Sequence, residues 1–353
     1  MEAPLVTSVV GIDIGSSVLR AVEVSDPASS KPMLVRCHVV ELPPGAVTSG
    51  EVIEPNTVAA ALKKLWSSGG FKSKNVVLGM GNQRVLARDL SVPKMGLARI
   101  RQSLPFEVQD MLPIPVADAL LDFYPISESE GPTGPLVNGL LIAAVKSAVL
   151  ANVKATQLAG LTTVDVDLIP FALSRVMVTR PGVTGTVALI DIGGSTTSVV
   201  IAADGVPQFV RIIATGGDDI TQALHTELKS DVGQAEGMKR AMGLATGAVQ
   251  ESDKRAVEII YKVASEQLTS LRNTINYFAN TRPTEPVRQI VLSGGGAQLH
   301  GLPEALAEMT RTSVIVGDPF ATVGIARGID AHQLRLSGST FAVALGLALG
   351  SAA

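Results

Sequence analysis

Aromatic residues are scarce in this chain, with one tryptophan, three tyrosines and eight phenylalanines among 353 residues. Core packing therefore falls to alanine, valine, leucine, isoleucine and glycine, and hydrophobic residues make up 46% of the sequence. A chain of this length and composition predicts at least two lobes, each able to bury a core of its own.

Other residue types and patterns are also scarce, and each scarcity disfavours a class of protein. The one cysteine, Cys37, permits no internal disulfide, which is typical of the reducing cytoplasm. The four histidines show no metal-ligand spacing, which disfavours a metal hydrolase. The net charge of −3 offers no broad basic field, so we expect no nucleic-acid partner. The start lacks the basic region of a signal peptide, and no stretch approaches the ~20 apolar residues of a spanning helix.

Two distant segments carry the same pattern of strand, turn and two further strands. The first covers residues 8–41, and the second begins near Thr184. Each first strand ends in Asp-Ile-Gly, with Asp13 and Asp191 at equivalent positions. This repetition predicts an internal duplication of one supersecondary unit.

The turns after these strands predict phosphate binding. Glycine permits a tight turn, and its backbone N–H groups with neighbouring hydroxyls can cradle phosphate oxygens. A hydrated Mg²⁺, bound through water, would explain a carboxylate at the end of each apolar strand. An ordinary hairpin is the alternative for one copy, but two facing copies would clamp a polyphosphate and its metal. The residues are Asp13, Gly15, Ser16 and Ser17 in the first copy and Asp191, Gly193, Gly194, Ser195 and Thr196 in the second.

Two further motifs extend this site. The strand at 289–293 ends in Gly294, Gly295 and Gly296, which would let backbone approach a flat ligand; a flexible turn is the alternative. Glu236 and Lys239 share one helix face and are within reach of a ribose or base, although a surface ion pair is equally plausible. The spacings of a dinucleotide fingerprint and of a P-loop are both missing.

The strand and helix patterns between residues 93 and 161 predict an inserted α/β module. Its helix contains Pro105, which is expected to kink or split it. The stretch 127–134 is expected to be an exposed loop, and 341–353 a packed helix, with a membrane-touching tail as the alternative. Apolar residues at helical spacing predict a long amphipathic helix over 257–280. The predicted divisions are 1–92 with 162–183 and 335–353 for the first lobe, 93–161 for the insertion, 184–217 with 286–334 for the second lobe, and 218–285 for its helical subdomain.

These motifs in this order resemble the actin-like ATPase superfamily, which includes actin, Hsp70, sugar kinases and FtsA. The resemblance implies an α/β protein with the actin-like ATPase fold, made of duplicated ribonuclease-H-like lobes with an FtsA-like inserted subdomain. It also implies connecting helices at 165–175 and 341–350. Five sequence segments are similar to those of the PilM family of the type IV pilus assembly platform. They are GIDIGSS, LPFEVQDMLPIP, LIAAVKSAVL, ATGGDDIT and AEGMK.

The PilM resemblance implies ATP and Mg²⁺ between the lobes, with Gly217 of ATGGDDIT among the nucleotide-binding residues. It further implies a groove between the first subdomain and the insertion for the N-terminal cytoplasmic peptide of a PilN-like membrane protein. Other pilus platform proteins are implied partners, and self-association is possible. We expect a cytoplasmic scaffold, recruited peripherally to the inner membrane by its partner, with slow or no hydrolysis. Asp167 is the candidate catalytic carboxylate, and a structural carboxylate is its alternative.

Three alternatives remain on the same fold. An FtsA-like division protein would be expected to carry a membrane-targeting helix after a linker. A small-molecule kinase would need a polar pocket with a placed base, and no such cluster is visible in the insertion. An Hsp70-like chaperone would need a further substrate domain. A related secretion machine is an alternative setting for the scaffold.

Overall fold

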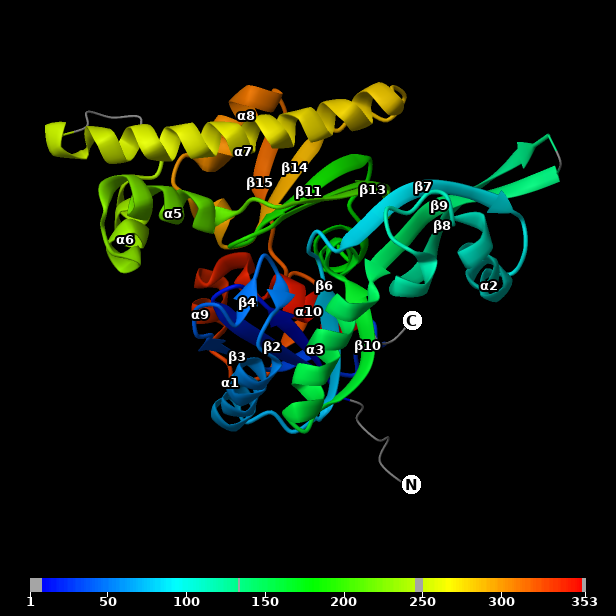
Figure 1. The fold of residues 1–353 in the computed structure, drawn as a ribbon, viewed down its shortest axis with the longest axis horizontal. Helices are drawn as coiled ribbons and strands as arrows, with labels where there is room; N and C mark the ends of the chain where they lie inside the picture. Colours follow the sequence, from blue (N-terminus) through cyan, green and yellow to red (C-terminus); the bar gives the residue numbers. More distant parts are fainter. Residues whose placement is uncertain (1–7, 133, 245–249, 351–353) are drawn as a thin grey trace.

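The computed structural model describes residues 8–132, 134–244 and 250–350. These residues form two lobes (Figure 1), and residues of both lobes line one cleft. The first lobe holds a sheet in the order β10-β6-β1-β2-β3-β16. Strands β1 to β3 are antiparallel, and β6 and β10 run parallel to β1. Their bounds are β1 Ser8–Ile14, β2 Val18–Ser25, β3 Met33–Glu41, β6 Asn75–Met80, β10 Thr162–Leu168 and β16 Gly324–Ile325, with a small hairpin of β4 Val47–Thr48 and β5 Glu51–Val52 beside them.

The second lobe repeats the plan of the first. Its sheet has the order β13-β12-β11-β14-β15, with three antiparallel strands followed by parallel additions. Asp13 and Asp191 are each the last residue but one of their strands, so the duplication predicted from sequence is confirmed. The bounds are β11 Thr186–Ile192, β12 Thr197–Ala203, β13 Val206–Ile213, β14 Gln289–Ser293 and β15 Ser313–Val316.

A shared core joins the two lobes. It contains valines and leucines from both sheets together with the short helix α4 (Ile169–Ser174) and the helix α10 (Ala342–Gly350). Residues 342–349 of α10 are all buried, as expected for a helix that is apolar on every side. The packed helix predicted over 341–353 is therefore confirmed for Ala342–Gly350, and residues 351–353 lie outside the described part of the chain.

The remaining helices cover the outer faces of the sheets. Helices α1 (Pro55–Gly69) and α3 (Lys146–Leu158) pack against each other on the first lobe. The second lobe carries the long amphipathic helix predicted at 257–280, observed as α7 (Lys254–Thr281). Its other helices are α5 Gly217–Leu228, α6 Val232–Met242 and α8 Leu302–Thr310, and short helical turns lie at Val116–Asp118, Arg175–Thr179, Glu251–Asp253, Gly296–Gln298 and Gly338–Phe341.

The inserted unit is a three-stranded sheet with one helix. The sheet has the order β7-β9-β8, formed by β7 Val85–Pro93, β8 Ala119–Gly131 and β9 Gly134–Val145, and α2 (Leu97–Glu107) packs on it. This unit has a separate small core around Phe123. Because β7 belongs to this sheet and α3 packs on α1, these contacts favour boundaries near Val85 and Val145, whereas the sequence placed them at 93 and 161.

Two local expectations for the insertion differ from the structure. Pro105 does not split α2, because it lies in the last turn, where its missing N–H removes one bond just before the helix ends at Glu107. Most of the stretch expected to be a loop is strand, since Ser127 to Gly131 of β8 pair with β9. Asn138 donates to the hydroxyls of Ser127 and Ser129 there, which supports a polar strand.

The chain also returns to the first lobe earlier than predicted. Residues 286–334 were assigned to the second lobe, yet Gly324 and Ile325 pair with Met33 and Leu34 of β3. The segment that follows includes α9 (Ala331–Leu336) and leads into α10. These pairings favour a crossing between Val316 and Gly324.

Candidate functional site

A cleft of about 770 Å³ lies between the lobes, and residues of both turns line it. All predicted nucleotide and metal residues line it. From the first lobe come Asp13, Gly15, Ser16 and Ser17, and from the second come Asp191, Gly193, Gly194, Ser195, Thr196, Gly217, Glu236, Lys239, Gly294, Gly295 and Gly296.

The same backbone hydrogen bond closes each of the two turns, and the turns lie close to each other. The N–H of Gly15 donates to the carbonyl of Val18 at 3.0 Å, and that of Gly193 to Thr196 at 2.9 Å. A side chain at Gly194 would place Cβ 2.6 Å from Asp218 Oδ2 and 2.7 Å from Ser16 Oγ. A larger residue at this position would therefore displace the side chains of Asp218 and Ser16.

Helix α5 points its amino terminus toward the second turn. The N–H groups of Gly217 and Asp218 donate to the carbonyls of Gly193 and Gly194 at 2.9 and 2.8 Å. Gln267 of α7 is buried and donates its amide to the carbonyl of Gly216 at 2.6 Å. Because backbone carbonyls satisfy these N–H groups, the helix favours an anion in the cleft only through its dipole, which Asp218 and Asp219 in the first turn partly offset.

Asp191 is buried, Asp13 is partly buried, and Arg20 lies beside them. Arg20 Nη1 lies 3.2 Å from Asp13 Oδ2. Burial raises the pKa of Asp13, and the charge and hydrogen bond of Arg20 oppose this rise. Burial raises the pKa of Asp191 to about 6, although a hydrogen bond from Ser293 lowers it; the Asp13 charge adds to the rise.

This pair fits a hydrated Mg²⁺ better than direct coordination. Within residues 8–132, 134–244 and 250–350, no group of three His, Cys, Asp or Glu side chains could hold a metal ion. Mg²⁺ keeps several waters and takes one or two carboxylates together with phosphate oxygens. Two under-compensated carboxylates in a phosphate cleft match that requirement.

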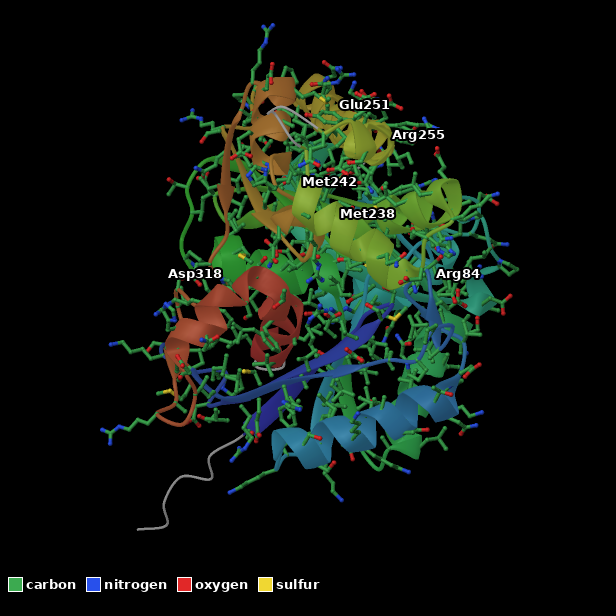
Figure 2. The ribbon with its side chains drawn as sticks, turned by 90° about the vertical axis from the view of Figure 1, so that its left-hand side faces the viewer. Arg84, Met238, Met242, Glu251, Arg255 and Asp318 are labelled. Atoms are coloured by element: carbon green, nitrogen blue, oxygen red, sulfur yellow. The ribbon has the colours of Figure 1, made fainter. Side chains whose placement is uncertain are left out.

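Glu236 and Lys239 sit on α6 at the second-lobe wall. Lys239 Nζ lies 2.6 Å from Glu236 Oε2 and also contacts the carbonyl of Gly217 and the hydroxyl of Thr221, at 3.1 and 2.9 Å. Burial acts to raise the pKa of Glu236, but hydrogen bonds from Lys239, Thr221 and Arg240 lower it to about 2. Figure 2 shows α6 in the upper lobe with Met238 and Met242 along it.

The glycine turn after β14 is held against β11. Gly294 has a φ of +88°, and a Cβ there would lie 2.3 Å from the carbonyl oxygen of Ile192. Its N–H donates to Ser339 Oγ at 2.8 Å. Gly295, by contrast, has no atom within 4 Å of a built Cβ, so its backbone faces open space in the cleft.

Asp167 is the predicted site residue that does not line the cleft. The expected helix over 165–175 is strand β10 up to Leu168, and α4 begins only at Ile169. Asp167 Oδ2 pairs with Arg175 Nη2 at 3.0 Å. Burial raises the pKa of Asp167, and Arg175 opposes the rise. Its catalytic role stays a prediction.

Sequence reasoning missed several residues that shape the cleft. Arg20 lies opposite Asp13 in the β1–β2 pairing, so the seven-residue spacing in a hairpin could have revealed it. Asp218 follows the Gly-Gly turn, and its contact with Ser16 spans 202 positions. Gln267 and Ser339 come from distant elements, and no local pattern marks them.

Two sheets of equivalent topology, with their Asp-Ile-Gly turns facing one cleft, define a protein of the actin-like ATPase fold. The sequence model of the family described as "Type IV pilus assembly protein PilM" matches residues 11–352. The chain therefore belongs to the PilM family.

Comparisons with individual proteins agree with the fold. A structure of a PilM-PilN type IV pilus biogenesis complex matches with a TM-score of 0.84 and 29% identity over 98% of both chains. MreB5 of Spiroplasma citri bound to AMPPNP matches with a TM-score of 0.55 at 10% identity, covering 97% of this chain and 95% of that chain. Cell division protein FtsA of Bacillus subtilis (strain 168) is 21% identical, covering 88% of this chain and 78% of that protein.

Among the described residues, no helix is both long enough and apolar enough to cross a membrane.

Proposed function

We propose that the chain is a cytoplasmic ATP-binding scaffold of the type IV pilus inner-membrane platform. The observation that carries this proposal is the convergence of both phosphate turns, the acidic pair and the Glu236/Lys239 face on one cleft. Family membership supports the pilus setting. A PilM-PilN complex of similar structure supports a PilN-like membrane protein as the partner.

Each lobe contributes a defined part of the nucleotide site. The turn amides and hydroxyls of Ser16, Ser17, Ser195 and Thr196 bind the phosphates, and the amino terminus of α5 adds positive potential. Asp13 and Asp191 hold Mg²⁺ through water, and the ion neutralises phosphate charge when bound. Glu236 and Lys239 contact the ribose or base, while Gly294 to Gly296 let it approach the backbone.

Binding rather than turnover is the proposed role of the nucleotide. Hydrolysis needs a group that orients the attacking water, and the candidate Asp167 is held by Arg175 away from the cleft lining. We therefore propose slow or no hydrolysis. Nucleotide binding sets lobe closure, and closure sets the affinity of the groove beside the inserted unit for the partner's N-terminal peptide.

The test measures nucleotide and peptide binding separately. A fluorescent ATP analogue is titrated into wild-type protein and into the variants Asp13→Asn and Asp191→Asn, with Mg²⁺ present. A synthetic N-terminal peptide of the PilN-like protein is then titrated with and without ATP. We expect both variants to lose nucleotide binding and the ATP effect on peptide affinity. Peptide binding that ignores ATP in the wild type would overturn the coupling, and no ATP binding would overturn the site.

A further inference from the structure

Helices α1 and α3 give the first lobe a strongly basic outer surface. They pack side by side, and Figure 1 shows them together on the lower lobe. The loop after α1 adds two lysines to the surface. Half of the twelve lysines in the chain lie here, and all six are exposed: Lys63, Lys64, Lys72, Lys74, Lys146 and Lys154. We name these six the lysine face.

The lysine face has few carboxylates to neutralise it. Residues 55–88 and 131–164 contain no aspartate or glutamate. Among neighbouring acids, Glu51 is paired with Arg84, Glu54 accepts a hydrogen bond from Thr57, and Asp165 lies on β10. In the part of the chain that the structure describes, none of the six lysines forms an ion pair within 4.0 Å. The net charge of −3 conceals this local concentration.

Exposed leucines alternate with lysines along α3. Lys146, Leu150, Lys154 and Leu158 are spaced by four and so lie on one side of the helix. Leu150 is 52% exposed and Leu158 is 40% exposed. A helix side with apolar residues between long cationic chains suits a lipid interface, where leucines reach the acyl boundary and ammonium groups meet the headgroups.

The loop after α1 is held firmly enough to present its lysines. Trp66 and Phe71 pack with ring centroids 5.1 Å apart. The indole N–H of Trp66 donates to the carbonyl of Ser73 at 3.0 Å. Lys72 and Lys74 flank Ser73, so their positions beside α1 are fixed by this packing.

We propose that the lysine face, with Leu150 and Leu158, binds the surface of an anionic lipid bilayer directly. The charges complement acidic headgroups, and lysines near such a surface each add to attraction. The exposed leucines favour lipid over nucleic acid, since a phosphate backbone gains nothing from them, and the face carries no arginine for base recognition. This contact is independent of the nucleotide and of the PilN-like partner.

Vesicle flotation with the full chain tests the proposal. Wild-type protein is mixed with vesicles of equal parts phosphatidylglycerol and phosphatidylcholine, and with phosphatidylcholine alone. We expect flotation with the anionic vesicles only, and its loss at high salt. The variant Lys146→Glu/Lys154→Glu should lower the bound fraction by at least about tenfold. Leu150→Ser should also lower it, although the charge is unchanged.

The charge-matched control is Lys229→Glu/Lys262→Glu, which alters two exposed lysines of the second lobe and should float like wild type. Circular dichroism and ATP titration check that every variant is folded. The proposal is overturned if wild type does not float, if the Lys146/Lys154 variant floats like the control, or if Leu150→Ser has no effect. Binding to duplex DNA or RNA without flotation would overturn it in favour of nucleic acid.

Discussion

Ser16 Oγ in the first lobe donates a 2.8 Å hydrogen bond to Asp218 Oδ2 in the second. This contact bridges the cleft at the point where the two phosphate turns meet. An incoming phosphate and the Asp218 carboxylate are both acceptors, so they compete for the same hydroxyl.

Because of this competition, substitutions of Ser16 and of Asp218 should change ATP affinity in opposite directions. Ser16→Ala should weaken ATP binding by about tenfold, because a hydrogen bond to a charged phosphate is lost. Asp218→Asn should tighten ATP binding several-fold, since it removes a negative charge beside the phosphates. Fluorescence titration of an ATP analogue measures both. Equal weakening by the two variants would show that Asp218 supports the ligand instead of opposing it.

Gly194 should tolerate a side chain poorly. Gly194→Ala places a methyl group 2.6 Å from Asp218 Oδ2 and 2.7 Å from Ser16 Oγ, so both side chains must move and their hydrogen bond across the cleft is lost. We expect weaker ATP binding, by about tenfold or about 1.4 kcal/mol, because Ser16 is displaced from the proposed phosphate site. Gly328→Ala is the matched control, because its Cβ also meets nothing within 4 Å and Gly328 is not among the residues that line the cleft. The prediction is wrong if the two variants bind ATP alike.

Asp191 should make the metal-free protein less stable as the pH rises. Its pKa of about 6 in the folded state exceeds the usual 3.8, so the folded protein binds the extra proton between these values. Stability is therefore lost as pH rises from about 4 to 6, and the cost reaches about 3 kcal/mol above that range. In EDTA, Asp191→Asn should melt higher than wild type at pH 8, with little difference at pH 4. A pH-independent difference would contradict this origin.

Lys239 should contribute far more to the stability of the protein than Arg240, although both pair with Glu236. Lys239 is largely buried and also satisfies Gly217 and Thr221, whereas the Arg240 side chain is 77% exposed. Lys239→Met should destabilise the protein by about 2 kcal/mol, because it leaves buried acceptors unpaired. Arg240→Ala should change stability by less than about 0.5 kcal/mol. Urea unfolding compares them, and a similar loss for both would refute the burial argument.

The sequence was informative wherever a local pattern fixes local geometry. The repeated Asp-Ile-Gly turns predicted the duplicated sheets, and the amphipathic spacing predicted α7 within a few residues. The glycine, proline and serine content of 127–134 predicted a loop where Ser127 to Gly131 form a strand, because cross-strand pairing stabilises a polar hairpin and composition does not reveal that pairing. Arg20, Asp218 and Gln267 reach the cleft through pairings across the sheet or between lobes, which no short motif encodes.

The position of α10 has a consequence for how the chain acquires its structure during synthesis. Gly11 lies so close to α10 that a Cβ there would sit 1.9 Å from the carbonyl oxygen of Ala344, and β16 completes the edge of the same sheet. Strand β1 thus waits for segments that are translated more than 300 residues later. Until then the apolar inner face of the first lobe has no cover, and a nascent chain depends on chaperones or on speed to avoid aggregation.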